Sequence, residues 1–357
     1  MSNPSAPPPS TPSPPPNPLQ EIEYHLLHLG KQVRDMQRAV AELKRAAGPK
    51  HMSWNQWLRH SIKESLGLTT NLGRLSFTET PRPLYVPRRY HRKPTLRHTP
   101  LISIVTPSFN QGSFLPRTIE SVLNQQYPRV EYVVQDGGST DDTKHVLDRY
   151  RDKLHHYEMR KDNGQSHAIN LGFAHTSGEI MAYLNSDDLF LPGAFFAVAR
   201  YFERHPDVDV VYGHRVVIDH LDNETGRWVL PPHDGEALKW ADYIPQETMF
   251  WRRRIWDKVG GIDESFRFAM DWDLLLRFQD AGAKFHRLGR FLGAFRVHQS
   301  SKTVTVVNDT GLMEMNRLRR RCHGRDVDPH EIQPNVRRYM WRHILCNRLY
   351  RLGLFRY

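Results

Sequence analysis

The chain has 357 residues and a formal net charge of +11. This length exceeds that of a single small domain and is typical of one large catalytic domain with flanking segments. The basic excess lies outside residues 101–300, where acidic side chains outnumber basic ones, so it says nothing about a central site. Only two cysteines, Cys322 and Cys346, are present, which excludes a disulfide-stabilised scaffold. Since we also find neither a signal sequence nor an apolar stretch of roughly 20 residues, we expect a cytoplasmic protein.

The first 47 residues contain two segments of different character. Residues 1–18 are rich in proline and polar side chains, cannot bury a core, and are expected to be disordered. Residues 19–47 carry apolar side chains at alternating spacings of three and four, which is the heptad pattern of a coiled coil. We therefore predict a coiled-coil helix that makes the protein a homo-oligomer, with an amphipathic helix packed on its own domain as the alternative. The apolar positions are Leu19, Ile22, Leu26, Leu29, Val33, Met36, Val40 and Leu43.

Residues 48–99 form a linker region with one expected helix at 54–66 and no recognisable chemistry. From residue 100 the pattern changes to an alternation of strands and helices, which indicates a mostly parallel sheet. The expected strands are 102–106, 131–135, 155–159, 180–184, 208–212, 247–251 and 284–295. The expected helices are 115–126, 141–151, 166–175, 192–205 and 271–281. Residues 304–357 form an Arg-rich tail that we expect to be helical.

Two adjacent carboxylates, Asp187 and Asp188, stand where the apolar run 180–184 stops. Neighbouring carboxylates repel each other, so at the end of a buried strand a cation usually offsets them. In open α/β sheets, ligands bind in the crevice beyond the carboxyl ends of the strands. The pair therefore predicts a metal site facing a phosphate-bearing ligand. The alternative is a solvated acidic turn before the helix that begins near Pro192.

Polar residues follow three further strands. Pro107 and Phe109 follow the first, Asp136 and its glycines end the second, and Gly164 and Gln165 follow the third. Such a row describes an elongated ligand lying across the edge of the sheet. No GxGxxG motif follows the first strand and no P-loop motif occurs in the chain, which argues against dinucleotide-binding and P-loop proteins.

Five ordered motifs resemble those of the family 2 glycosyltransferases, which have the GT-A fold. The resemblance covers roughly residues 100–303, and although each motif is weak by itself, the ordered set is a strong signal. It implies an α/β protein with a Rossmann-like, mostly parallel central sheet flanked by helices. The motifs are Ile104–Asn110, Asp136–Asp141, Asn185–Asp188, Met270–Leu274 and Arg296–Thr303.

The resemblance also implies roles for the residues of the donor site. Pro107, Phe109 and Asp136 would hold the nucleobase of a nucleotide-sugar donor, with a UDP-sugar as the favoured donor. Gly164 and Gln165 would lie near the ribose.

The resemblance places the metal and the general base at three further positions. Asp187 would lie near the ribose or the phosphates, and Asp188 would bind the divalent cation, Mn²⁺ or Mg²⁺, together with His298. A single imidazole favours Mn²⁺ somewhat. Asp271 is the candidate general base, because it opens an expected helix whose N-terminal dipole keeps a carboxylate ionised. The alternative roles are a helix cap for Asp271 and a structural or solvated histidine for His298.

We place Gln246, Trp251 and Trp272 on the acceptor side, where an aromatic ring can face a sugar. Packing of both tryptophans in the core is the alternative. Two departures from the family pattern concern charge. Asn185 stands where many relatives carry an acid, and Met270 replaces the acid that commonly precedes the base.

The resemblance implies an inverting, metal-dependent glycosyltransferase that moves a sugar from a nucleotide-diphosphate donor to a glycan or lipid-linked acceptor, and we expect it to act in surface polysaccharide biosynthesis. A catalytically inactive nucleotide-sugar-binding scaffold protein is the alternative, supported by the two departures in charge. The basic tail either lies on an anionic membrane surface or packs on the catalytic domain. We expect no nucleic-acid partner, because the central region is acidic and no recognition motif is present.

Overall fold

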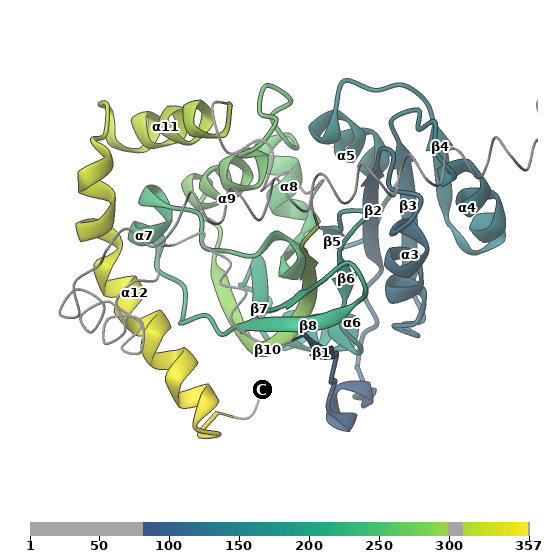
Figure 1. Ribbon diagram of the computed structural model, residues 1–357, viewed down its shortest axis with the longest axis horizontal. Coiled ribbons are helices and arrows are strands. Elements are labelled where there is room, and N and C mark those ends of the chain that lie inside the picture. Colours follow the sequence, from purple (N-terminus) through teal and green to yellow (C-terminus); the bar gives the residue numbers. More distant parts are fainter. Residues whose placement is uncertain (1–80, 299–309, 356–357) are drawn as a thin grey trace, which may run out of the picture. The chain divides into compact units, whose positions relative to one another are not determined.

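The computed structural model describes residues 81–298 and 310–355 (Figure 1). The proline-rich segment 1–18, the predicted coiled coil 19–47 and the predicted helix 54–66 lie outside the described residues. Among the described residues, one large sheet forms the centre and helices flank it.

Four parallel strands make up one half of the sheet, in the order β5-β2-β3-β4. Every residue of β2 and β5 is buried, as expected for parallel strands that are covered on both faces. The strands are β2 (Ile102–Ser108), β3 (Val130–Asp136), β4 (His156–Met159) and β5 (Ile180–Tyr183). The helices between them are α3 (Leu115–Leu123), α4 (Thr143–Tyr150) and α5 (Gln165–Ala174). The predicted alternation of strands and helices is confirmed here, with bounds that differ by a few residues.

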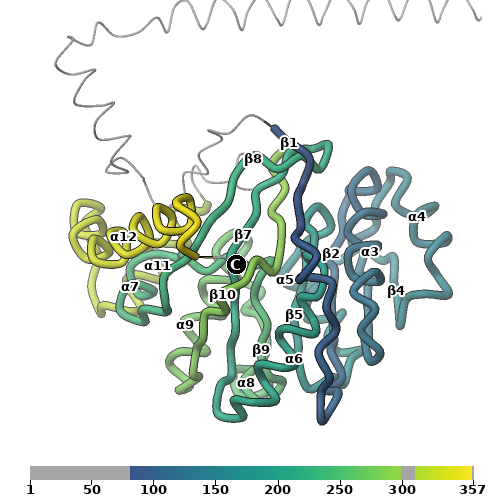
Figure 2. The backbone as a smooth tube through the Cα atoms, turned by 90° about the horizontal axis from the view of Figure 1, so that it is seen from below, coloured from purple at the N-terminus to yellow at the C-terminus, as the bar shows by residue number. Residues whose placement is uncertain are grey.

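The other half of the sheet is mixed. Strand β9 (Phe250–Arg252) runs antiparallel to both β5 and β7 (Val210–Ile218). Strand β8 (Asn223–Trp228) pairs antiparallel with β7, and β1 (Arg82–Pro83) continues the sheet beside β8 (Figure 2). The long strand β10 (Phe285–Arg296) is parallel to β7 and antiparallel to β6 (Leu189–Phe190).

The sequence prediction missed β8 because its residues are mostly polar. Glu224 on β8 is fully buried, and its carboxylate accepts hydrogen bonds from Arg82 at 2.5 Å and from Arg227 at 2.7 Å. Backbone pairing and a buried ion pair therefore hold this strand, whereas apolar alternation was the signal sought. Tyr90 is also buried, so residues that the sequence places in a linker contribute to the core.

Further helices complete the domain. The sequence predicts the two longest, α6 and α9. It does not predict α7 and α8, because their six and seven residues are too few to show a helical period. The α-helices are α6 (Ala194–Arg204), α7 (Gly235–Trp240), α8 (Arg253–Val259) and α9 (Met270–Asp280). Short 3-10 helices lie at η1 (Arg88–His91), η2 (Arg151–Lys153) and η3 (Gln246–Thr248).

The C-terminal tail consists of two helices, α11 (Thr310–His323) and α12 (Pro329–Arg351). Leu318 and Tyr339 belong to the same apolar core cluster as α9. Arg319 donates a hydrogen bond to the carbonyl of Trp240 at 2.9 Å. One face of the tail therefore packs on the catalytic domain. Within the part of the chain that the structure describes, no helix is both long and apolar enough to span a bilayer.

Candidate functional site

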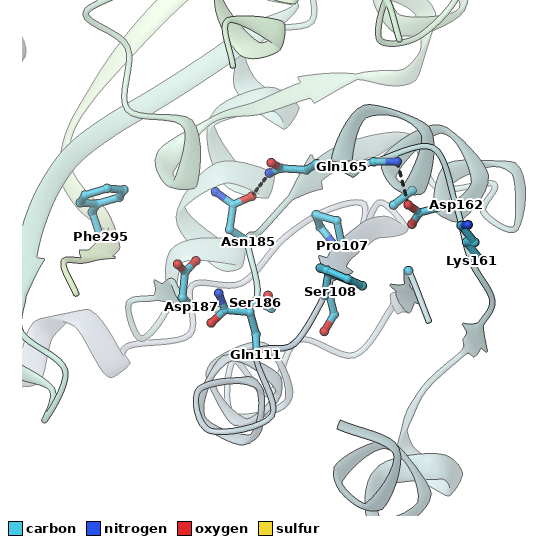
Figure 3. A pocket seen from close by; sticks show the side chains of 14 residues that line it. Pro107, Ser108, Gln111, Lys161, Asp162, Gln165, Asn185, Ser186, Asp187 and Phe295 are labelled. Atoms are coloured by element: carbon cyan, nitrogen blue, oxygen red, sulfur yellow. Dashed lines mark hydrogen bonds between the residues drawn. The ribbon is translucent and has the colours of Figure 1, made fainter. Parts of the chain in front are cut away.

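Two pockets open at the carboxyl ends of the parallel strands. The larger has a volume of about 560 Å³ and the smaller about 240 Å³. Both are lined by Gln165, Asn185 and Phe295, so they meet at these three side chains. Figure 3 shows the residues that line the larger pocket. The larger pocket is also lined by Pro107, Ser108, Phe109, Gln111, Gly137, Lys161, Asp162, Gly164, Ala168, Ser186 and Asp187.

The loops after β2 and β3 hold each other in place at the larger pocket. Asn110 has a φ of 52°, and its backbone N–H donates to the Ser139 hydroxyl at 2.7 Å. Its side-chain oxygen accepts the Thr140 N–H at 2.9 Å. Phe109, 62% exposed, stands beside this turn and lines the pocket. These contacts fix the backbone of the turn beside Phe109, whose exposed ring offers a surface on which a planar base could stack.

Asp136 is completely buried and shapes the turn that follows β3. Its carboxylate accepts the N–H groups of Gly138 at 3.0 Å and Ser139 at 2.7 Å, and also the Ser139 hydroxyl at 2.6 Å. Gly137, the next residue, lines the pocket. Both carboxylate oxygens therefore have hydrogen-bond partners within the turn that Asp136 begins.

The loop before α5 supplies another wall of the larger pocket. Gly164 adopts a φ of 112°, which side-chain-bearing residues rarely tolerate, and its N–H donates to Asp162 at 2.7 Å. Lys161 lines the same wall and brings a cation that the sequence analysis did not select. Figure 3 shows Gln165 and Asn185 pointing toward one another, and the Gln165 amide donates to the Asn185 oxygen at 2.6 Å.

The turn that carries Asp187 and Asp188 is held by β10 and α3. Arg296 on β10 is fully buried, and its guanidinium donates to the Asp187 carbonyl at 2.7 Å. Its backbone N–H donates to the Asp188 carboxylate at 2.9 Å. From α3, the Thr118 hydroxyl contacts the carbonyls of Ser186 and Asp188. The carboxylate pair therefore stands on a rigid support, in which Arg296 is a residue whose role the sequence analysis missed.

His298 lies beside Asp187, with 3.0 Å between the imidazole Nε2 and the carboxylate Oδ2. Its ring also packs on Phe114 at a centroid distance of 4.6 Å. Asp188 is only 1% exposed, and burial, followed by the charges of Asp187 and Glu247, raises its pKa well above the usual range. A carboxylate and an imidazole this close are a donor set that suits Mn²⁺. The geometry thus brings His298 to Asp187, where the sequence had paired it with Asp188.

Asn185 connects the two pockets through its amide group. Its oxygen accepts from Gln165, while its NH₂ donates to Gln246 at 3.1 Å and to Asp188 at 3.3 Å. Gln246 in turn donates to the Tyr183 carbonyl at 2.7 Å. A carboxylate at position 185 could not donate either bond, so the departure from the family pattern gives this network its donors.

The smaller pocket gathers four carboxylates, of which sequence reasoning selected two. Asp188 and Asp271 were candidates, whereas Asp242 and Glu247 were not. Burial, followed by the charge of Asp271, raises the pKa of Asp242 well above the usual range. Arg215 on β7 offsets part of this charge, because its guanidinium donates to both Glu247 oxygens at 2.8 and 2.6 Å. Arg215 and Glu247 lie on different elements and are far apart in the sequence. They therefore form no local motif from which the pair could be predicted.

Asp271 lies in the first turn of α9. A residue of α11 holds the backbone of residues 267–269, which lead into this helix. The Glu314 carboxylate accepts the N–H groups of Arg267, Phe268 and Ala269 at 2.8, 2.8 and 2.9 Å. The Met270 sulfur lies 3.0 Å from the Ser166 hydroxyl, and this side chain is buried. Met270 lines the smaller pocket, but its side chain is buried, so an acid at this position would have little contact with solvent.

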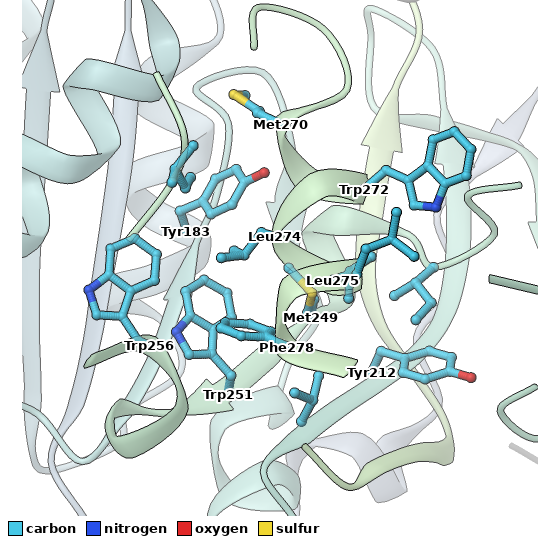
Figure 4. Packing of buried hydrophobic residues seen from close by; sticks show 14 of the residues in the cluster. Tyr183, Tyr212, Met249, Trp251, Trp256, Met270, Trp272, Leu274, Leu275 and Phe278 are labelled. Carbon is cyan, nitrogen blue, oxygen red and sulfur yellow. The ribbon is translucent and has the colours of Figure 1, made fainter. Parts of the chain in front are cut away.

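The two tryptophans assigned to the acceptor side are core residues. Trp251 is fully buried and packs against Trp256 and Phe278 (Figure 4). Trp272 borders the smaller pocket, but its side chain is also fully buried and its indole N–H donates to the Leu238 carbonyl at 2.8 Å. Burial favours packing, which was the alternative, for Trp251, whereas Trp272 is buried and also lines the smaller pocket, so its acceptor-side role stays a prediction. Gln246 does line the smaller pocket.

Comparison with proteins of known structure supports the fold. The chain is similar to Staphylococcus aureus TarS, solved in complex with UDP-GlcNAc, with a TM-score of 0.53 and 17% identity over 69% of this chain and 73% of that one. It is also similar to the mannosyltransferase PcManGT from Pyrobaculum calidifontis, solved with GDP-Man and Mn²⁺, with a TM-score of 0.50 and 17% identity over 81% and 76% of the two chains. The GT-A fold predicted from the sequence is confirmed.

Sequence comparison identifies the family. Residues 103–261 match the family model described as "Glycosyl transferase family 2". An uncharacterised glycosyltransferase of Mycobacterium tuberculosis is 30% identical over 184 residues, which cover 50% of this chain and 68% of the relative. The chondroitin synthase of Escherichia coli is 30% identical over 211 residues, which cover 56% of this chain and 30% of that enzyme. The chain therefore belongs to glycosyl transferase family 2.

Proposed function

We propose that this protein is an inverting, metal-dependent glycosyltransferase that uses a nucleotide-diphosphate sugar. The observation that carries the proposal is the pair of pockets meeting at Gln165, Asn185 and Phe295, one beside Asp187 and the other beside Asp271. A donor in the larger pocket and an acceptor in the smaller one would place the transferred sugar where the pockets meet. The ligands named for TarS and PcManGT, UDP-GlcNAc and GDP-Man, support a nucleotide sugar as the donor.

The larger pocket has the features that a nucleotide needs. Pro107 and the exposed Phe109 provide a flat apolar surface for the base, and we retain Asp136 as the residue that shapes the base-binding turn. Gly164 and Gln165 would lie near the ribose. Because UDP and GDP differ only in the base, these residues support a nucleotide without selecting one.

We propose Asp187 and His298 as the protein ligands of the divalent cation, in place of Asp188 and His298. Asp187 lines the larger pocket and its oxygen lies 3.0 Å from the imidazole, whereas Asp188 is buried and bonded to Arg296. Two protein ligands leave positions for phosphate oxygens and water, which is the usual arrangement for Mn²⁺ or Mg²⁺ at a nucleotide. When bound, such an ion offsets the negative charge that develops on the diphosphate leaving group.

We assign Asp271 as the general base. It faces the smaller pocket from the first turn of α9, where the helix dipole favours a charged carboxylate. From there it can accept the proton of an acceptor hydroxyl that attacks the anomeric carbon. Because acceptor and leaving group would lie in different pockets on either side of that carbon, the attack would proceed in line and invert it. The likeness to a chondroitin synthase supports a glycan acceptor.

Transfer is tested by incubating the full chain with UDP-, GDP- and dTDP-sugars, Mn²⁺ and candidate glycan or lipid-linked acceptors. Release of the nucleoside diphosphate, dependent on one donor and on the cation, is the expected result. Tight donor binding without product would favour the inactive scaffold protein instead. Absence of both binding and turnover for every donor would refute the proposal.

We also propose that α12 attaches the protein to an anionic membrane surface. Opposite its packed face, α12 exposes the large apolar side chains of Trp341 and Leu345, and Leu352 continues this stripe just after the helix ends; Trp341 is 53% exposed. Arg337 and Arg348 are exposed along the same face, because residues four and seven apart share one side of a helix. An apolar stripe bordered by arginines complements a lipid surface that carries negative charge.

The Trp341→Ala/Leu345→Ala double variant is expected to bind vesicles that contain phosphatidylserine about tenfold more weakly than the unchanged protein, since two apolar side chains no longer enter the interface. Sedimentation with these vesicles, and with pure phosphatidylcholine vesicles, measures the effect. Met313→Ala, which removes an exposed apolar side chain from α11, is the matched control. Equal sedimentation of the double variant and the unchanged protein would contradict the assignment.

A further inference from the structure

A second group of metal-ligating side chains lies away from both pockets. His156 and Glu158 belong to β4, and His175 caps the C-terminal end of α5. One imidazole nitrogen of each histidine and one carboxylate oxygen of Glu158 all lie within 4.8 Å of one another. None of the three lines the larger or the smaller pocket. The proposed catalytic reaction therefore leaves this group unexplained.

The fold brings these residues together from two elements. His156 and Glu158 are two positions apart on β4, so they project from the same face of the sheet. Helix α5 packs across the neighbouring strands β2 and β3 and ends beside them. The two imidazole rings stack at a centroid distance of 3.9 Å and an interplanar angle of 22°.

His156 has a buried nitrogen without a partner. Its Nε2 makes no hydrogen bond with any described residue, although buried polar atoms rarely remain unbonded. The Glu158 carboxylate accepts a hydrogen bond from the Gln135 amide at 3.2 Å and lies 3.5 Å from the Arg160 guanidinium.

We propose that His156, Glu158 and His175 form a second divalent-cation site, which prefers Zn²⁺ to Mg²⁺ or Mn²⁺. Two imidazoles and one carboxylate are a donor set found in three-ligand zinc sites. Nitrogen ligands favour zinc, whereas magnesium prefers oxygen. His175 is exposed, so water can reach the ion and complete its coordination.

An ion here would act on the donor pocket from a distance. The loop of residues 160–164 connects strand β4 to helix α5. This loop contributes Lys161, Asp162 and Gly164 to the lining of the larger pocket. A cation bound to β4 and to His175, the residue that follows α5, joins the two elements that carry the loop. Zinc is therefore expected to stabilise the protein and this wall of the pocket, independently of the cation at Asp187.

The experiment is calorimetric titration of the full metal-free chain with Zn²⁺, comparing the unchanged protein with the His156→Gln/His175→Gln double variant. The matched control is His155→Gln, because His155 is exposed and immediately precedes β4, next to His156 in the chain but outside the proposed donor set. Since the chain has 20 histidines, the difference between variants is the readout. We expect the double variant to lose one zinc equivalent, or to bind it about 10- to 100-fold more weakly, while His155→Gln binds normally.

Two further measurements separate this site from the catalytic one and from misfolding. Asp187→Asn is expected to keep the zinc equivalent, and the unchanged protein is expected to melt at a higher temperature with zinc than the double variant does. Circular dichroism checks that the double variant is folded. A folded double variant that binds as much zinc as the unchanged protein, with the same affinity, would overturn the proposal, as would a loss of the equivalent in His155→Gln.

Discussion

Replacing Asp271 by Asn is expected to lower kcat by about 10²- to 10⁴-fold, because Asn cannot take the proton from the acceptor hydroxyl. Donor affinity should change little, since Asp271 lies in the smaller pocket and the nucleotide is assigned to the larger one. Steady-state kinetics with the donor identified in the screen, together with calorimetric donor titration, measure the two quantities.

The matched control for this experiment is Asp280→Asn, at the exposed far end of the same helix. It removes one negative charge from α9 but is distant from both pockets, so kcat should be unchanged. Full activity in Asp271→Asn would exclude this residue as the base and would direct attention to Asp242, the other carboxylate of the smaller pocket with unassigned chemistry.

Replacing Asp187 by Asn is expected to raise the Mn²⁺ concentration needed for half-maximal activity by about 10²-fold, since the cation would lose its charged protein ligand. His298→Gln should act in the same direction. Activity measured across a Mn²⁺ titration, with donor saturating, gives the shift. Asp257→Asn, an exposed carboxylate on α8, should leave the titration unchanged.

Asp188→Ala distinguishes the two possible metal assignments. Its loss leaves the buried N–H of Arg296 without an acceptor, which costs about 1–3 kcal/mol of folding stability. If Asp187 and His298 hold the cation, thermal unfolding of Asp188→Ala should shift while Mn²⁺ activation of the folded enzyme changes less than in Asp187→Asn. The reverse pattern would restore Asp188 as the metal ligand.

Sequence reasoning reached the parallel half of the sheet and five of the residues that line the larger pocket: Pro107, Phe109, Gly164, Gln165 and Asp187. Their signals are local: an apolar run marks β5, and the glycines and polar residues after each strand mark a turn. The carboxylate that contacts His298 could not be predicted from a local pattern. Asp187 and His298 are 111 residues apart, and their contact depends on where β10 ends relative to β5.

The tryptophans and the buried charges show a second kind of limit. A tryptophan that packs in a core and one that faces a sugar look the same in a sequence. The role of Trp251 could therefore not be assigned until its burial was known. Arg215 and Glu247 compensate each other across two elements, and neither forms a motif. Buried ion pairs of this kind, like Glu224 with Arg227, place polar residues at core positions. A prediction based on hydrophobicity therefore does not identify these positions as buried.

The bonds from Glu314 to the turn before α9 have a consequence for how this enzyme can be divided. A fragment ending at residue 303, where the family resemblance stops, would lack the acceptor for three N–H groups beside Asp271, and also Leu318 and Tyr339 of the core. The C-terminal helices are thus not an appendage that can be exchanged between relatives. The shortest self-sufficient enzyme has to run beyond Tyr339, and any chimera must transfer α9 together with α11.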